Sequence, residues 1–534
     1  MTYVIDGGCC NDGSCVTVCP VQCIRPRPGD PDFSSTEQLY IDPATCIDCG
    51  ACLDECPVDA VYADWDMPDE VGPYLEINAE YFVTNPLVGN AAPTFTRRVL
   101  PARRPELRVA IVGSGPAACY AAGALSDMAG VTVTVVERLP VPFGLVRAGV
   151  APDHQNTKKI ADRFASVLAR NNVQCYFNVE VGTDVSIEEL LQHHHAVIWA
   201  AGAGGDRRLG IPGEELAGCH SARSFVAWYN GDPDTVGANF DLSGERAVVV
   251  GNGNVALDVA RTLLRSPEEF RSTDMADEAI AALESSKIVE VVVAARRGPE
   301  YAAYTLAELM ALDRLGEFTI TAEPDEVQQH EGGGDRRHAI IVAASHRAPD
   351  AGGRVLRFRF GLQPEAIEGN GRVESMTFRK PDGTHEQIPT SLVFRAIGYQ
   401  APPVPGLPFD EATATLPNEA GRVLDPATGE EVSGVYCSGW IKRGPRGVIG
   451  TNKHDAEETV DGLLHDFSAD RLPDPSHGAE KFESLLRERK PGLLDKAAWN
   501  RIELEEKRRG RAASRPRQKF VTVADLLAAS HADA

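Results

Sequence analysis

A dense run of cysteines constrains the fold of this 534-residue chain more than any other feature. Residues Cys46 to Pro57 read Cys-Ile-Asp-Cys-Gly-Ala-Cys-Leu-Asp-Glu-Cys-Pro, which is the spacing C-x2-C-x2-C-x3-C-P. Thiolates at these intervals can surround an iron–sulfur cluster, and the cysteine before proline usually serves a second cluster. A zinc site usually takes two separated CxxC pairs, and disulfides are unusual in a chain that is not exported. The run therefore predicts iron–sulfur ligation.

A first run with the same register lies upstream of it. Cys9, Asp12, Cys15, Cys19 and Pro20 give C-x2-D-x2-C-x3-C-P, with aspartate in the second slot. Two such runs exchange their last cysteines between two clusters. We therefore assign one 4Fe-4S cluster to four thiols: Cys19, Cys46, Cys49 and Cys52.

The other cluster takes Cys9, Cys15 and Cys56, and its fourth corner is open. Asp12 could supply a carboxylate oxygen as the fourth ligand, or Cys10 could move to supply its thiolate. With neither, the corner is missing and the cluster is 3Fe-4S rather than 4Fe-4S. We expect Cys23, which follows the first run, to be a non-ligand.

Charge and hydropathy narrow the possible partners. The formal net charge of −24 argues against nucleic acid. No stretch of about eighteen apolar residues predicts a membrane span, and no signal peptide is visible, so we expect a cytoplasmic protein. Arg25 and Arg27 are the only cations before Arg97, which makes residues 1–82 strongly acidic. That acidity either serves solubility or forms a surface for a basic patch on a redox partner.

From residue 107 the pattern changes to alternating strands and helices. An apolar strand over 109–113 leads into Gly113-Ser-Gly-Pro-Ala-Ala118 and a helical pattern, and a second strand over 132–136 ends at Glu137. This is GxGxxA followed by an acid about twenty residues later. Gly113 permits the tight turn, Gly115 lets amides approach a pyrophosphate at the helix N-terminus, and the acid suits a ribose hydroxyl. The pattern predicts a dinucleotide site.

A second copy of this pattern begins at residue 247. The strand over 247–251 leads into Gly251-Asn-Gly-Asn-Val-Ala256, and a helical pattern follows. The next strand, 291–294, is followed by Arg296 and Arg297 rather than by an acid. Two guanidiniums at the place of a 2′-phosphate favour NADP over NAD. The alternative is an arginine pair on a solvated strand end.

These patterns predict an α/β chain with two Rossmann-like domains, the NADP domain inserted in the FAD domain, preceded by a small α+β dicluster module. The expected order is an iron–sulfur module over 1–82, a linker over 83–106, an FAD-binding domain over 107–210 and 396–534, and an NADP-binding domain over 211–395. Strands near 392–398 and 434–440 are expected to return to the FAD domain.

Two basic segments have no assigned role. The linker arginines, Arg97, Arg98, Arg103 and Arg104, could lie against the acidic module or be solvated. The basic run between Lys507 and Lys519 is expected to be a solvated or loosely ordered tail.

Six motifs carry a specific resemblance. They are Val141-Pro-Phe-Gly-Leu-Val-Arg147, Gly149-Val-Ala-Pro-Asp-His154, Ile211-Pro-Gly-Glu-Glu215, Gly251 to Asp258, Arg296-Arg-Gly-Pro299 and Gly439-Trp-Ile-Lys-Arg-Gly-Pro445. From about residue 107 to 534 the chain resembles the adrenodoxin reductase-type ferredoxin–NADP reductases. Residues 2–66 resemble the bacterial seven-iron and eight-iron ferredoxins. The whole chain resembles the ferredoxin/ferredoxin–NADP reductase fusion proteins.

The resemblance implies cofactor contacts at individual positions. It implies FAD contacts at Ala117, Glu137, Leu145, Val181, Trp440, Gly447, Val448 and Ile449. It implies NADP contacts at Asn252, Gly253, Asn254, Val255, Arg296, Arg297, Glu308 and Gly447. His154 matches a histidine that the family has near the flavin, and we weigh a catalytic role for it against a structural one.

The expected function follows from these sites and the resemblance. A flavin exchanges two electrons with a nicotinamide and single electrons with a cluster. We expect a ferredoxin–NADP(+) reductase that passes electrons between NADPH, FAD, the fused clusters and an outside ferredoxin or other one-electron redox protein. The alternatives are an electron-input flavoprotein like the glutamate synthase small subunit, and a non-enzymatic iron–sulfur redox sensor.

Overall fold

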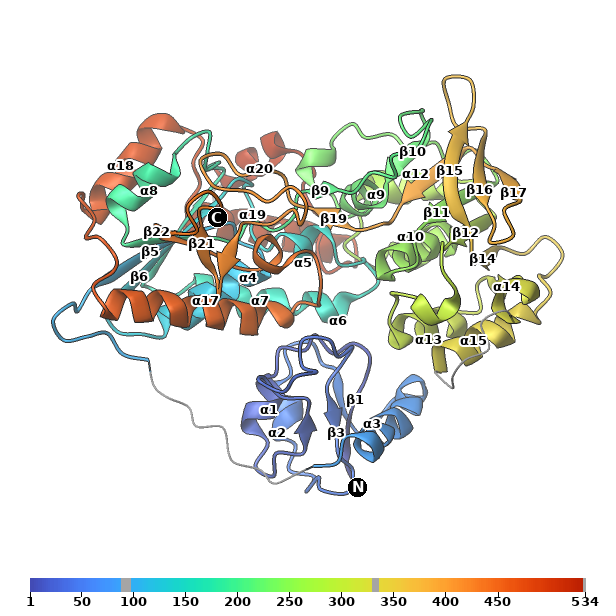
Figure 1. Ribbon diagram of the computed structural model, residues 1–534, viewed down its shortest axis with the longest axis horizontal. Coiled ribbons are helices and arrows are strands. Elements are labelled where there is room, and N and C mark those ends of the chain that lie inside the picture. Colours follow the sequence, from blue (N-terminus) through green and yellow to red (C-terminus); the bar gives the residue numbers. More distant parts are fainter. Residues whose placement is uncertain (88–97, 329–335, 532–534) are drawn as a thin grey trace.

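The computed structural model describes residues 1–87, 98–328 and 336–531 of the chain. Figure 1 shows two lobes, each built on its own sheet, with the N-terminal module lying beneath both. The module lies against α17 (Thr451–Ser468) of one lobe and α13 (Leu306–Arg314) of the other. Within the described residues, no helix has the length and apolar character needed to cross a membrane.

The N-terminal module is a small α+β unit. Strands β1 (Tyr3–Ile5) and β4 (Val61–Ala63) pair antiparallel, as do β2 (Ile24–Arg25) and β3 (Tyr40–Ile41). The helical segments are α1 (Ser14–Val18), α2 (Ala51–Glu55), η1 (Asp69–Val71) and α3 (Pro73–Thr84). Each cysteine run turns into its short helix at a left-handed glycine, Gly13 (φ 67°) or Gly50 (φ 76°). Only glycine adopts this conformation at little cost.

The first lobe is built on a seven-stranded sheet in the order β20-β21-β22-β8-β5-β6-β7. Its strands are β5 (Leu107–Val112), β6 (Val131–Glu137), β7 (Val173–Phe177), β8 (Ala196–Trp199), β20 (Asn418–Glu419), β21 (Arg422–Leu424) and β22 (Glu431–Cys437). The central strands are parallel and apolar, because helices and loops cover both faces. The helices are α4 (Pro116–Ser126), α5 (Leu145–Ala148), α6 (Gln155–Lys158), α7 (Ile160–Leu168), α8 (Ile187–His193) and α16 (Trp440–Arg443).

The second lobe is built on a six-stranded parallel sheet in the order β10-β18-β11-β12-β14-β13. Its strands are β10 (Cys219–Ser221), β11 (Arg246–Val250), β12 (Glu290–Ala294), β13 (Thr319–Ala322), β14 (Val355–Arg359) and β18 (Leu392–Arg395). An antiparallel meander adds β15 (Gln363–Glu368), β16 (Ser375–Arg379) and β17 (His385–Pro389). The helical segments are α9 (Ala222–Tyr229), η2 (Pro233–Thr235), α10 (Asn254–Leu264), α11 (Pro267–Phe270), α12 (Asp277–Glu284), η3 (Pro299–Tyr301), α14 (Pro324–Gln328) and α15 (Arg336–Ser345).

The two lobes form an α/β fold in which the second interrupts the first. The chain crosses between them at one short antiparallel pair, β9 (Gly205–Asp206) with β19 (Tyr399–Gln400). The expected strand near 434 is β22 and does return to the first sheet. The expected strand near 392 does not: β18 pairs with β10 and β11 in the second sheet. That prediction was wrong, because an apolar run does not reveal which parallel sheet it completes.

The C-terminal tail is packed rather than loosely ordered, which corrects the expectation for its basic run. Helices α18 (Ala479–Arg489), α19 (Lys496–Ala512) and α20 (Val523–Ser530) cover the first lobe. The side chain of Lys519 is 1% exposed and pairs with Asp274 of the second lobe at 2.8 Å. Arg517 pairs with Glu503 at 2.7 Å. Lys519 can be buried because an acid from a distant segment, Asp274, pairs with it.

The arginines before β5 lie against the first lobe and not against the acidic module. Arg98 pairs with Asp461 of α17 at 2.6 Å. Arg104 pairs with Asp474 and lies 4.1 Å above the ring of Phe467. Arg97 lies outside the described residues.

Candidate functional site

The cysteines of the N-terminal module line two separate cavities. The first is lined by Cys19, Cys46, Cys49 and Cys52, with Cys23 beside them. The second is lined by Cys9, Cys15 and Cys56, with Cys10 and Asp12 beside them. The last cysteine of each run thus lines the other run's cavity.

The thiols fit metal ligands rather than a disulfide framework. All thirteen cysteines are free, including the nine in the module. Several converging thiols that do not pair with one another are the donor set that iron–sulfur clusters require.

The two cavities face different surroundings. Cys49 of the first cavity is exposed, and so are the neighbouring apolar side chains Ile47 and Leu53. Beside the second cavity, Cys10 and Val58 are buried in the same hydrophobic cluster as the core of the first lobe. One cavity therefore opens toward solvent and the other lies against the flavoprotein lobe.

Asp12, the residue in the unmatched slot, is 5% exposed and is contacted by three residues, Ser14, Arg163 and Lys453. Its Oδ1 accepts a hydrogen bond from the amide of Ser14 at 3.0 Å, and its Oδ2 accepts one from the Ser14 hydroxyl at 2.6 Å. From the first lobe, Arg163 approaches Oδ2 at 3.4 Å, and Lys453 donates to the carbonyl oxygen of Asp12 at 2.9 Å. Two cations of the flavoprotein thus lie at the edge of the second cavity.

The first glycine loop has the geometry that a dinucleotide site needs. Gly113 (φ 98°) follows β5, and a Cβ there would lie 2.8 Å from the carbonyl oxygen of Ala200. Gly115 is the N-cap of α4, and a Cβ on it would meet no atom within 4 Å, so its backbone is open to a ligand. Glu137, at the end of β6, accepts hydrogen bonds from the amide and hydroxyl of Ser114 at 3.0 and 2.7 Å. Burial raises the pKa of this carboxyl.

Other residues expected to contact FAD surround this loop. A Cβ on Gly144, next to Leu145, would lie 3.3 Å from the Cα of Gly115. A Cβ on Gly439, next to Trp440, would lie 2.7 Å from the Cβ of Ala117. Val181 is buried in the apolar cluster against which Trp440 packs.

The turn at Gly447, Val448 and Ile449 links the flavin site to the second cysteine cavity. It leads into Gly450, whose amide donates to the carbonyl oxygen of Cys10 at 2.7 Å. Ile449 packs in the same cluster as Cys9 and Cys10. The residues expected to contact flavin and those expected to hold a cluster are therefore adjacent.

The second glycine loop repeats the design in the other lobe. Gly251 (φ 121°) follows β11, and a Cβ there would lie 2.3 Å from the carbonyl oxygen of Ala396. Gly253 caps α10, which begins at Asn254 and continues through Val255. Arg296 and Arg297 follow β12 and are both exposed, with Arg297 lying 4.8 Å above the ring of Tyr301.

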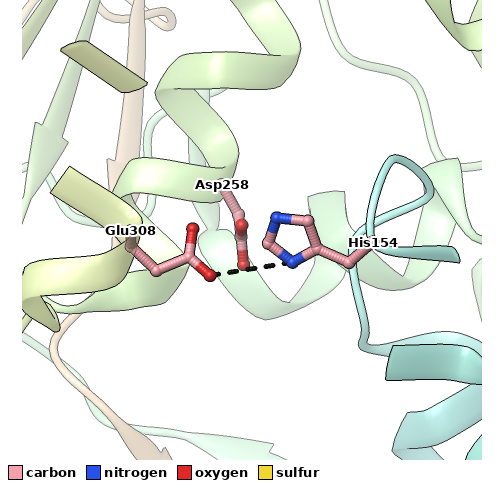
Figure 2. A group of neighbouring side chains, drawn as sticks. All are labelled: His154, Asp258 and Glu308. Carbon is pink, nitrogen blue, oxygen red and sulfur yellow. Dashed lines mark ion pairs between the residues drawn. The ribbon is translucent and has the colours of Figure 1, made fainter. Parts of the chain in front are cut away.

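Three acid–base side chains meet between the lobes. Figure 2 shows His154 from the first lobe pointing toward Asp258 of α10 and Glu308 of α13. Ligand atoms of the three lie within 4.8 Å of one another, and His154 Nδ1 lies 3.7 Å from Glu308 Oε1. Arg261 pairs with Glu308 at 2.9 Å and also pairs with Asp258.

The pKa values of the two carboxyl groups in this cluster, those of Asp258 and Glu308, are shifted in opposite directions. Burial raises the pKa of Asp258 to about 6, against the opposing effect of Arg261. Burial also opposes ionisation of Glu308, but His154 and Arg261 hold its pKa below the ordinary value. Arg261 already neutralises both carboxylates, which disfavours a metal ion there.

Sequence reasoning missed four of these side chains: Asp258, Arg261, Arg163 and Lys453. The first two lie four and seven residues after Asn254, and helical spacing placed them near the glycine loop. No sequence signal connects Arg163 or Lys453 with a cysteine run more than 140 residues away.

Two family models match the chain. Residues 107–297 match the pyridine nucleotide-disulphide oxidoreductase family, and residues 8–60 match the 4Fe-4S dicluster domain.

Curated relatives match over most or all of the chain. It is 46% identical to a probable ferredoxin/ferredoxin–NADP reductase of Mycobacterium tuberculosis, over 99% of this chain and 95% of that protein. It is 43% identical to a probable ferredoxin/ferredoxin–NADP reductase of Mycobacterium leprae, over 99% of this chain and 98% of that protein. Among solved structures, that of Mycobacterium tuberculosis FprA in complex with NADPH has a TM-score of 0.75 and 39% identity, and covers 80% of this chain and 100% of its own.

Proposed function

The chain belongs to the ferredoxin/ferredoxin–NADP reductases, and on that premise we propose that it is an NADPH:ferredoxin oxidoreductase. It passes electrons between NADPH, FAD, the fused iron–sulfur clusters and an outside ferredoxin-type acceptor. The observation that carries the proposal is the adjacency of Ile449 and Gly450 to Cys10, because it brings the flavin turn next to a cysteine cavity.

Two iron–sulfur clusters are proposed in the module. The cavity of Cys19, Cys46, Cys49 and Cys52 would hold a 4Fe-4S cluster. The cavity of Cys9, Cys15 and Cys56 would hold a 4Fe-4S or a 3Fe-4S cluster, according to whether Asp12 or Cys10 supplies a fourth ligand. The hydrogen bonds and the cation that occupy both oxygens of Asp12 favour three thiolates alone.

The flavoprotein residues bind and orient the two dinucleotides. Bound FAD would exchange two electrons with NADPH and single electrons with a cluster. The open backbone at Gly115 would accept a pyrophosphate, whose charge the helix dipole of α4 would favour. The corresponding loop at Gly253 would do the same for NADP, and Arg296 and Arg297 would pair with its 2′-phosphate.

His154 and Glu308 lie beside the second loop. The imidazole Nδ1 is 3.7 Å from a carboxylate oxygen of Glu308, so a protonated imidazole would form an ion pair with it. Asp258, with a pKa of about 6, holds a proton at mildly acidic pH. This arrangement supports a role for His154 at the expected NADP contact Glu308.

The outside acceptor is proposed to dock at the first cavity. Ile47 and Trp65 are each 56% exposed there, and acids of the same surface include Asp48, Asp54 and Asp66. An apolar patch within an acidic surface suits a one-electron carrier with cations around its own cofactor.

The proposal is tested by comparing an acceptor that takes electrons from the clusters with one that can take them directly from flavin. In Cys46→Ser, reduction of cytochrome c by NADPH should fall at least tenfold, while reduction of ferricyanide, which can take electrons directly from flavin, should stay within twofold. Cys23→Ala is the matched control, because Cys23 lines the same cavity without being an expected ligand. Equal loss of both activities in Cys46→Ser would show that the clusters are not on the exit path.

A further inference from the structure

Helix α13 is clamped between the cysteine module and the core of the second lobe. Met310 is buried in a cluster that includes four apolar side chains of the module: Val4, Val71, Tyr74 and Ile77. Its neighbour Leu309 is fully buried in the core of the second lobe. The approach is close, since a Cβ on Gly7 of the module would lie 2.2 Å from the Cβ of Ala307. The position of α13 therefore depends on the docked module.

One module side chain fixes the point where α13 begins. Glu37 accepts a hydrogen bond from the amide of Leu306 at 2.9 Å through Oε2, and pairs with Arg337 at 3.0 Å through Oε1. Leu306 is the first residue of the helix, so its amide has no acceptor within the helix. A carboxylate at that end also interacts favourably with the helix dipole.

The same turn is bonded to the second glycine loop. The amide of Thr305 donates to Oδ1 of Asn254 at 2.8 Å. The carbonyl oxygen of Asn252 accepts from the amides of Ala303 and Tyr304 at 3.1 and 3.0 Å. Three hydrogen bonds thus join the segment before α13 to the residues expected to contact NADP.

The first turn of α13 also carries Glu308. Its amide donates to the hydroxyl of Thr305 at 3.3 Å, and its carboxylate pairs with Arg261 at 2.9 Å. A shift at the start of α13 would therefore move Glu308 and the Asn252–Asn254 loop together.

We infer that Glu37 is a positioning residue for the NADP site, acting through Leu306 and Thr305, so that docking of the cysteine module tightens nucleotide binding. This rests on the proposed assignment of the second loop to NADP. Because coupling between two binding events is reciprocal, bound NADP(H) must also stabilise the docked module.

The sign of the effect separates positioning from simple electrostatics. Glu37 is an anion and NADP is an anion, so removing the carboxylate would tighten binding if charge alone mattered. If the carboxylate holds α13 in place, removing it weakens binding. Titration calorimetry of the FAD-loaded full chain with NADP⁺ should show Kd for Glu37→Ala raised roughly 5- to 20-fold.

A second variant removes the hydrogen-bond donor, the amide of Leu306, and keeps the carboxylate of Glu37. Leu306→Pro lacks the amide, and proline is tolerated at the first position of a helix. Thr305 already has the extended conformation that precedes proline (ψ 155°). Both variants should raise KM for NADPH and leave the maximal rate of ferricyanide reduction within twofold.

The control keeps the module but removes a different interdomain acid. Glu80 pairs with Arg336 of α15 at 2.7 Å rather than with the start of α13, so Glu80→Ala should change Kd by less than twofold. An unchanged or lower Kd in Glu37→Ala would overturn the inference, and so would an equal weakening in Glu80→Ala. Failure of the unaltered chain to bind NADP⁺ would instead reject the proposed function.

Discussion

The amide of Gly450 donates to the carbonyl oxygen of Cys10 over 2.7 Å, and this bond joins the flavoprotein lobe to the first cysteine run. Gly450 has φ −70°, which any residue can adopt. Its requirement for glycine comes from the close approach, because a Cβ would lie 2.1 Å from the carbonyl carbon of Asn11 and 2.2 Å from the amide nitrogen of Asp12. The module can dock as it does only where the lobe presents no side chain.

Gly450→Ala should therefore displace the module without a conformational penalty of its own. We expect NADPH-dependent reduction of cytochrome c to fall at least tenfold, while reduction of ferricyanide and the FAD content stay within twofold. Gly123→Ala is the control, since a Cβ on that helical glycine would make only an ordinary contact, 3.5 Å from Val167. Unchanged cytochrome c reduction in Gly450→Ala would contradict the assignment of this contact to electron exit.

The cysteine register allows a prediction of how the thiols group. The spacing fixes which thiols can face inward around one centre, and the structure places Cys19 and Cys56 each in the cavity of the other run. The strand–glycine–helix patterns at Gly113 and Gly251 were equally informative, because the tight turn and the open helix end are local properties. Features that depend on a few neighbouring residues could be predicted.

Contacts between segments that are distant in the sequence could not be predicted. The basic run ending at Lys519 has the same composition as a solvated tail, and its burial depends on Asp274, far away in the sequence. The strand β18 was expected in the wrong sheet for a similar reason, since an apolar run carries no information on its neighbours. His154 was identified only by resemblance, while its partners Asp258 and Glu308 come from two helices of the other lobe.

The arginine pair after β12 provides a test of nucleotide preference. Arg296 and Arg297 are both exposed, and an arginine can form two hydrogen bonds with a phosphate. The double alanine variant should lose roughly 10- to 100-fold in kcat/KM for NADPH, with little change for NADH. Arg379→Ala, at an exposed arginine on β16, is the control for loss of positive charge. A preserved NADPH/NADH ratio in the double variant would exclude these residues as the determinants.

The carboxyl of Asp258 should make stability depend on pH. Burial raises its pKa from 3.8 to about 6, so the folded state binds this proton more tightly than the unfolded state does. The resulting stabilisation is complete below the unfolded pKa and is lost as pH rises through 6, by at most about 3 kcal/mol. Asp258→Asn should therefore gain stability relative to the unaltered chain between pH 5 and 7.

Thermal release of FAD, followed by flavin fluorescence from pH 5 to 8, measures this difference. The asparagine can still accept a hydrogen bond from Arg261, which also keeps Glu308 and Asp153 as partners. The melting temperatures of the two proteins should be closest at pH 5 and separate as pH rises. Parallel curves over the whole range would show that Asp258 does not take up the proton.

Arg163 should set the potential of the cluster that lies against the flavoprotein. Its guanidinium lies 3.4 Å from Asp12 and 3.5 Å from Glu55, at the edge of the cavity of Cys9, Cys15 and Cys56. A nearby cation stabilises the more negative, reduced cluster, so Arg163→Ala should lower that potential by roughly tens of millivolts and leave the other cluster unchanged. An EPR-monitored redox titration measures the potentials of both clusters.

Lys159→Ala is the control for Arg163→Ala, because Lys159 pairs with Asp59 at the same interface but not with Asp12. Equal shifts in the two variants would mean that overall charge, rather than this contact, sets the potential.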